Sequence, residues 1–205
     1  MKKLLLTFFV ALSTLGISAK SMIEIWSSIP EELVPYVDNT HRLEMTDFIG
    51  MGLKGDVDNV MGSKSVMDTI TNNFIHVTLS ESATLEIKRL PMAEGDSILC
   101  VIRTWKAPEG ESSVAFYDQN WEKIDKSLDI ASYASQLYAR PDTMSEGNYS
   151  DLVKNIDFTM VKASLSPSNE DLTLDLSVPT GNKDVDMKLK SITKQKILHW
   201  NNGSY

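Results

Sequence analysis

The chain has 205 residues, with 28 acidic and 20 basic side chains, a net charge of −8 and one cysteine. A hydrophobic content of 42% with 23% charged residues excludes intrinsically disordered, collagen-like and low-complexity proteins and predicts a packed core. The acidic balance excludes a nucleic-acid-binding surface, because such a surface needs lysine and arginine side chains to displace counterions from phosphates.

The first residues have the pattern of a secretory signal peptide. Two lysines precede an apolar run over residues 4–17, and the small residues Ala19 and Ser21 follow. The run is shorter than the roughly 20 residues that span a bilayer, so we expect no membrane anchor. Cleavage after Ala19 or after Ser21 fits the pattern, and the Ala-Lys-Ser match favours the second. We therefore expect a signal peptide over 1–21 and a periplasmic or extracellular product.

Residues 39–54 predict an amphipathic helix, with Gly55 as the glycine that follows its end. Non-polar or small residues recur there at helical spacing: Met45, Phe48, Ile49 and Gly52. Before this helix, Pro30 and Pro35 bracket a shorter helical turn. We expect the two pieces to form a helical hairpin.

From Phe74 onward the apolar period changes from that of a helix to that of a strand. Four strands joined by loops of hairpin length are expected, over 74–79, 83–90, 97–105 and 113–118. The third, SILCVIRTW, is apolar on both faces, which predicts a strand at the sheet centre. Its Cys100 is expected to be a buried small side chain without nucleophilic reactivity.

After Trp121 the pattern begins again with one helical stripe, formed by Ile130, Ala134, Leu137 and Tyr138. Four more strands are expected, over 157–165, 171–178, 185–192 and 195–200. A helical segment followed by four strands thus occurs twice. This order predicts an α+β fold with antiparallel sheets and N-terminal helices, organised as tandem repeats over 22–124 and 125–205.

The sequence carries no motif that identifies a reaction. It has no Gly-x-Ser-x-Gly elbow, no phosphate-binding glycine loop and no His-Glu-x-x-His motif. His41, His76 and His199 are not at metal-ligand spacing, so we expect no metal and no cofactor. Paired carboxylates in 55–59 and 184–186 lack the ligand set of a calcium loop, and we interpret them as solvated turn charges.

The preferred function is a non-enzymatic envelope or extracellular module that binds a protein or a glycan through one sheet face. Aromatic side chains suit a stacking platform for a sugar or peptide, although core or hairpin packing is the favoured use of them. The candidate binding residues are Trp105, Tyr117, Trp121 and His76.

The alternative function is a carboxylate-dependent hydrolase acting on glycans or peptides. Its candidate carboxylates are Asp56, Asp58 and Glu86. Such an enzyme requires a deep pocket in which carboxyl groups have raised pKa values.

The runs TNNFIHVTLSES, LEIKRLP and SILCVIRTWKAPEGESSVAFYDQNW, within residues 65–121, resemble a family of exported Bacteroidales proteins known only as a domain of unknown function. The earlier run HRLEMTDFIGMGL fits the same family, so the resemblance covers most of the chain after the signal peptide. It implies an exported bacterial protein with tandem sheets, and it implies no activity and no catalytic residues.

Three short Asp-Ser/Thr-aliphatic patterns resemble the acceptor sites for O-linked glycans in exported proteins of Bacteroides-type bacteria. They place the candidate hydroxyls at Thr69, Ser97 and Thr143. Glycosylation of at least one of them predicts a native mass above that of the signal-cleaved chain.

Overall fold

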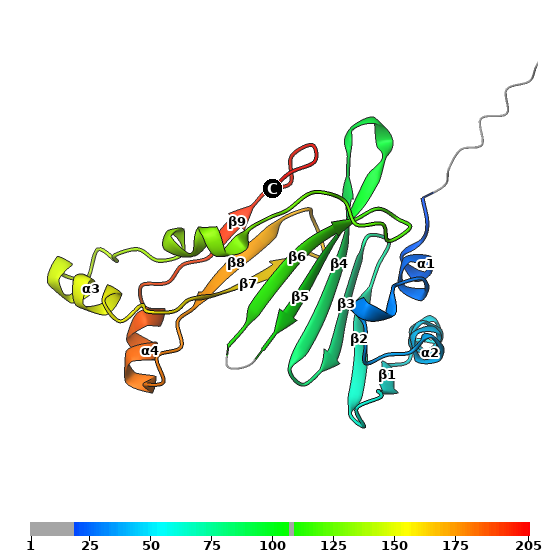
Figure 1. The fold of residues 1–205 in the computed structure, drawn as a ribbon, viewed down its shortest axis with the longest axis horizontal. Helices are drawn as coiled ribbons and strands as arrows, with labels where there is room; N and C mark the ends of the chain where they lie inside the picture. Colours follow the sequence, from blue (N-terminus) through cyan, green and yellow to red (C-terminus); the bar gives the residue numbers. More distant parts are fainter. Residues whose placement is uncertain (1–18, 107–108) are drawn as a thin grey trace, which may run out of the picture.

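The computed structural model describes residues 19–106 and 109–205, and it confirms an α+β fold with antiparallel sheets (Figure 1). Most of the predicted signal peptide, residues 1–18, lies outside the described part. A six-stranded sheet runs in chain order through β1 (Gly55–Asp58), β2 (Lys64–Ile70), β3 (Phe74–Ser80), β4 (Ala83–Pro91), β5 (Ser97–Trp105) and β6 (Glu111–Tyr117). A second sheet contains β7 (Met160–Leu165), β8 (Leu172–Ser177) and β9 (Lys196–Leu198).

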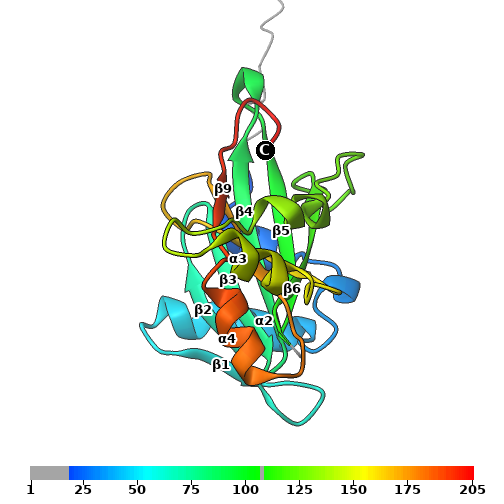
Figure 2. The same cartoon turned by 90° about the vertical axis from the view of Figure 1, so that its left-hand side faces the viewer.

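The helices lie on both sides of the six-stranded sheet (Figure 1). The α-helices are α1 (Met22–Ser27), α2 (Asn39–Gly50), α3 (Glu146–Val153) and α4 (Lys183–Lys190), and the short 3₁₀ helices are η1 (Glu31–Leu33), η2 (Ala93–Gly95) and η3 (Ile130–Gln136). Helices α1 and α2 cover one face, and the second sheet lies on the other side with α3 and α4 beyond it (Figures 1 and 2). Within the described residues, no helix is both long enough and apolar enough to cross a membrane.

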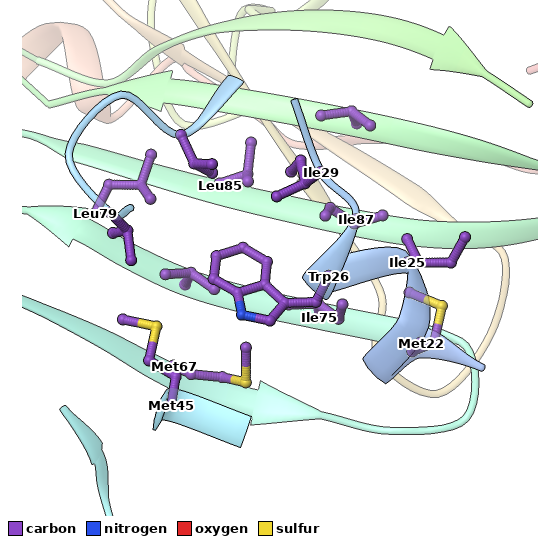
Figure 3. Packing of buried hydrophobic residues seen from close by; sticks show 14 of the residues in the cluster. Met22, Ile25, Trp26, Ile29, Met45, Met67, Ile75, Leu79, Leu85 and Ile87 are labelled. Atoms are coloured by element: carbon purple, nitrogen blue, oxygen red, sulfur yellow. The ribbon is translucent and has the colours of Figure 1, made fainter. Parts of the chain in front are cut away.

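The first hydrophobic cluster fills the space between α1, α2 and the six-stranded sheet (Figure 3). Trp26 lies at its centre, fully buried, and its indole N–H donates to the Arg42 carbonyl at 3.0 Å. Side chains alternate along a strand, so Ile75 and Val77 of β3 face this cluster while Phe74 faces the opposite side. This cluster holds α1 and α2 against the sheet. The helical turn predicted between Pro30 and Pro35 is η1, and α1 was not predicted.

The second hydrophobic cluster lies between the other face of the six-stranded sheet and β7–β9. Cys100 and Ile102 of β5 point into it, as do Ala163 of β7 and Leu174 of β8. The prediction that residues 97–105 form the central strand is wrong, because β5 lies beside the edge strand β6 and β3 and β4 are central. Residues on both sides of β5 are apolar because a packed layer covers each face of the sheet.

The predicted helix over 39–54 is confirmed as α2, although it ends at Gly50. Gly52, with a φ of +74°, adopts the left-handed conformation at the helix end that was predicted for Gly55. Gly55 instead starts β1, where an added Cβ would lie 3.2 Å from the Met45 carbonyl oxygen. The glycine at this position therefore permits close packing of β1 against α2.

The second half of the chain differs from the prediction at two helices: α3 was not predicted, and α4 was predicted as a strand. Residues 185–192 were predicted as a strand, and this is wrong because most of them belong to α4. Val185 and Leu189 stand four residues apart on one helix side, and Leu189 is buried. The sheets contain six and three strands, and the second cluster joins residues from both halves, so the two helix-plus-four-strand units are not confirmed.

Candidate functional site

The four predicted binding residues do not form one platform. The rings of Tyr117 and Trp121 lie 5.6 Å apart, but Trp121 is only 8% exposed and its indole N–H donates to the Ile25 carbonyl at 3.2 Å. Trp105 stands at the far end of β5, 42% exposed, with the Arg103 guanidinium 5.3 Å from its ring centroid. His76 points to the opposite face of the sheet, so the aromatic residues and the histidine cannot contact one ligand together.

Trp121 belongs to the packing of the N-terminal helix. Its φ of 68° is in the left-handed region, which costs a non-glycine residue roughly 1 kcal/mol or more. The turn is held by the Asp118 carboxylate, which accepts from the Asn120 backbone N–H at 2.7 Å and from that of Glu122 at 2.9 Å. Burial against α1 compensates the backbone strain at Trp121.

His76 lies in a polar cluster on the face of the sheet that bears Phe74. Its Nδ1 donates to the Asp68 carboxylate at 3.0 Å, and the Thr78 hydroxyl and backbone N–H donate to the same oxygen at 2.8 and 3.1 Å. Across the ladder, His76 is the direct partner of Glu86 on β4. His76 is half-buried, in a position typical of a surface or interfacial histidine.

Glu86 is the half-buried carboxyl group of this cluster. The Leu165 backbone N–H donates to its Oε2 at 2.6 Å. Burial raises the pKa of Glu86 above its ordinary range, opposed by that hydrogen bond and by the charges of His76 and Lys162. Ionisation of Glu86 is therefore disfavoured inside the fold.

The other carboxylates proposed for a hydrolase lie elsewhere. Asp56 and Asp58 are on the edge strand β1, where both contact the Lys64 ammonium, at 3.3 and 3.4 Å. Three strand spacings separate β1 from β4, which puts these carboxylates about 14 Å from Glu86. The paired carboxyl groups of glycoside hydrolases lie about 5 to 9 Å apart, so this set does not form such a pair.

The six-stranded sheet supplies the hydrogen-bonding partners of the edge strand β7. The Ala163 backbone N–H donates to the buried Ser112 hydroxyl at 2.9 Å, and Leu165 donates to Glu86. Lys88 is fully buried, and its Nζ donates to the Ser166 carbonyl at 3.0 Å. These contacts satisfy backbone groups that the edge strand leaves unpaired, which is the structural use of Glu86 and Lys88.

A groove between α3 and α4 is the strongest candidate binding site. It has a volume of about 450 Å³ and lies beside a second hollow of about 360 Å³, and Asn155 and Val185 line both. Figure 2 shows the two helices side by side at the end of the molecule. The larger part is lined by Met144, Asn148, Asp151, Leu152, Asn155, Val185, Lys188 and Ser191.

The groove combines an apolar floor with hydrogen-bonding walls. Leu152 and Val185 are partly buried against the second hydrophobic cluster, while Asn148 and Lys188 are exposed. Phe158, 57% exposed, borders the smaller hollow. This site could not be predicted from the sequence, because residues 185–192 were expected to form a strand and the groove exists only if they form α4.

The predicted inert cysteine is confirmed as a buried side chain. Cys100 has no exposed surface, and burial raises the pKa of its thiol, with the nearby Glu86 charge acting in the same direction. A protonated, inaccessible thiol is a poor nucleophile. In residues 19–106 and 109–205, no three histidine, cysteine, aspartate or glutamate side chains are grouped to hold a metal ion.

The three candidate acceptor hydroxyls differ in surroundings. Thr143 is exposed in the loop before α3. Ser97 is half-buried at the start of β5, and its hydroxyl accepts from the Gln119 side chain at 3.1 Å. Thr69 is half-buried in β2. Glycosylation stays a prediction, and Thr143 is the most accessible of the three.

Comparison with known proteins supports the fold and gives no activity. The family described as "Protein of unknown function (DUF3256)" matches residues 14–205, which confirms the resemblance to a domain of unknown function. No curated protein matches the chain. A solved structure, described as a domain of an uncharacterized protein from Porphyromonas gingivalis W83, is similar with a TM-score of 0.68 and 17% identity, covering 89% of this chain and 96% of its own.

Proposed function

The chain belongs to the family of proteins of unknown function described as DUF3256, and we propose that it is an exported, non-enzymatic module that binds a glycan or a protein in the groove between α3 and α4. We place it in the periplasm or outside the cell. A restriction of the family to Bacteroidales is part of the same proposal.

The groove is the observation that supports binding. Asn148 and Asn155 line it, and each amide side chain can donate and accept hydrogen bonds. Asp151 and Lys188 add one acceptor and one charged donor, while Leu152 provides apolar contact. This mixture suits a hydroxyl-rich ligand, so a glycan is the favoured ligand and a protein segment is the second.

The groove replaces the sheet face as the expected binding surface. The centre of the six-stranded sheet is covered on both sides by the two hydrophobic clusters. Trp105 remains an exposed aromatic side chain at the sheet end, but the other candidate aromatic residues lie in packing positions. Export is supported by the signal pattern over residues 1–21.

A glycan array followed by binding titration tests the proposal. Asn148 and Lys188 are the residues to change, because neither side chain donates a hydrogen bond within the described chain. The double variant Asn148→Ala/Lys188→Ala removes two ligand contacts, so we expect affinity to fall about tenfold or more. The control is Asn72→Ala, an exposed residue in the turn before β3.

Two outcomes contradict the groove as the binding site. One is equal affinity in the double variant and the wild-type chain. The other is the absence of any binding to the array and of any partner recovered repeatedly from envelope extract. Selective recovery of a protein through the groove would support the module and replace the glycan as its ligand.

A hydrolase is the second candidate function, and one observation favours it: His76 and Glu86 are paired across β3 and β4, with the pKa of Glu86 raised by burial. Assays on glycan and peptide substrates test it. A genuine activity should be lost in Glu86→Gln and kept in Asp56→Asn. Equal activity in both variants would remove Glu86 from any role in hydrolysis.

A further inference from the structure

Residues immediately after Ala19 make specific contacts with the folded chain. The Lys20 backbone N–H donates to the Gln119 side-chain oxygen at 2.9 Å. The Lys20 ammonium donates to the Gln119 carbonyl at 3.0 Å and to the Asn120 side chain at 2.8 Å. The Arg89 guanidinium donates to the Lys20 carbonyl. Lys20 is thus held by a strand and by the turn after β6.

Ser21 is the N-cap of α1. Its hydroxyl accepts from the Glu24 backbone N–H at 3.2 Å, and its own backbone N–H donates to the Glu24 carboxylate at 2.7 Å. The two bonds form a capping box, which satisfies backbone donors that a helix start leaves free. The next residue, Met22, is only 2% exposed and lies in the first hydrophobic cluster.

We infer that the export protease cleaves the Ala19–Lys20 peptide bond, so that the mature protein begins at Lys20. This inference rests on the proposed export. Water is added across the bond, leaving a carboxylate on Ala19 and an α-amino group on Lys20. The nitrogen of the new α-amino group is the Lys20 backbone nitrogen, so it can still donate a hydrogen bond to the Gln119 side-chain oxygen. Lys20 and Ser21, which hold and cap the start of α1, then belong to the mature protein.

Cleavage after Ser21, which the Ala-Lys-Ser pattern favours, would remove these contacts. The Glu24 N–H would lose its acceptor, and Arg89 would lose the Lys20 carbonyl. A positive α-amino group would also appear on Met22, at the start of a helix where partial positive charge already accumulates. Both bonds follow a small residue, so the contacts made by Lys20 and Ser21 distinguish them.

The first test is the N-terminus of the exported protein. The full 205-residue chain is produced in a Gram-negative host, purified without a tag from the periplasm or medium, and analysed by intact mass and N-terminal sequencing. We expect a chain that begins at Lys20. A chain beginning at Met22 overturns the inference and leaves export standing, whereas a chain that keeps residues 1–19 contradicts the proposed export itself.

Two leader variants separate the two bonds by the residue that precedes each. Processing occurs before folding, so the readout does not depend on stability. Ser21→Val removes the small residue before the Ser21–Met22 bond and should leave processing at Lys20 unchanged. Ala19→Val removes the small residue before Lys20 and should leave unprocessed precursor. The inference is overturned if Ser21→Val leaves unprocessed precursor while Ala19→Val is processed normally.

A third measurement tests the structural reason directly. Mature chains beginning at Lys20 and at Met22 are prepared by releasing each from a cleavable fusion, and their thermal unfolding is compared. Loss of the cap and of the Lys20 contacts should lower the midpoint by roughly 3 to 6 °C in the shorter chain. Equal midpoints would show that Lys20 and Ser21 contribute nothing to the fold, which contradicts the basis of the inference.

Discussion

At the scale of single residues, the alternation of apolar and polar residues correctly predicted the burial of a side chain when that burial depends on the strand's own pattern. It predicted the burial of Cys100. It could not place Trp121, whose burial depends on a contact with Ile25, a residue far earlier in the chain. An aromatic residue in a turn gives no local signal that a distant helix will cover it.

Trp121 should therefore matter for stability. Trp121→Ala removes a buried indole and its hydrogen bond to Ile25, so we expect a loss of about 3 kcal/mol in unfolding free energy, even with relief of the backbone strain. Trp105→Ala, at an exposed position, should change stability by less than about 1 kcal/mol. Chemical denaturation measures both; similar losses in the two variants would contradict this assignment.

Glu86 should make stability depend on pH. Because burial raises its pKa, the unfolded chain ionises this carboxyl at lower pH than the folded chain. Its contribution is fully present below the unfolded pKa and is lost as pH rises through the folded pKa. Glu86→Gln keeps an acceptor for Leu165, so we expect it to be more stable by about 1 kcal/mol at pH 7 and unchanged near about pH 3.

Denaturation of both proteins across this pH range checks the sign of that effect. A variant less stable than the wild-type chain at pH 7 would mean that attraction to His76 and Lys162 outweighs the cost of burying the charge.

At the scale of elements, strong alternation gave β3, β4, β5 and β6 with nearly their observed bounds. Several elements were missed, among them α1, β1, β2 and α3, and α4 was predicted as a strand. The first strand, β1, is short and carries two aspartates, so its apolar pattern is weak. In the segment VDMKLK, alternating polar and apolar residues fit a strand, but the helix is decided by Asn182, which caps it, and by contact of Leu189 with the core.

Asn182 should therefore determine the stability of α4. Its side chain accepts from the backbone N–H groups of Asp184 and Val185 at 3.0 and 3.3 Å. Asn182→Ala should cost about 1 kcal/mol and increase amide exchange across α4, with Asn72→Ala as the unchanged control. Unaltered exchange in α4 would show that contact with the core alone maintains the helix.

At the scale of the whole molecule, the six-stranded sheet is shared by two cores. The apolar residues on both sides of β5 are the sign of this sharing in the sequence, but they do not show which elements cover each face. The second sheet is fixed to it by packing and by a few buried polar contacts. Ser112 is one of these, 9% exposed, and its hydroxyl lies 2.7 Å from that of Thr104 while accepting from Ala163. The groove between α3 and α4 depends on this attachment, because both helices are connected to β7–β9.

Ser112→Ala leaves the buried Ala163 N–H without its acceptor. We expect a loss of about 2 kcal/mol and faster amide exchange in β7–β9 than in β2–β5. The control is Ser113→Ala, the exposed neighbour on the same strand, which should be neutral within about 0.5 kcal/mol. Equal behaviour of the two variants would show that packing alone holds the sheets together.

The contact between α1 and the turn at 118–122 has a consequence for the proposed export. Ile25 and Trp121 are 96 positions apart, so α1 can make its final contacts only after the turn at 118–122 is available. Closing so long a loop is entropically costly and slow to occur. If the chain is exported N-terminus first, as proposed, α1 would thus lack its final contacts until more than half of the chain has crossed the membrane.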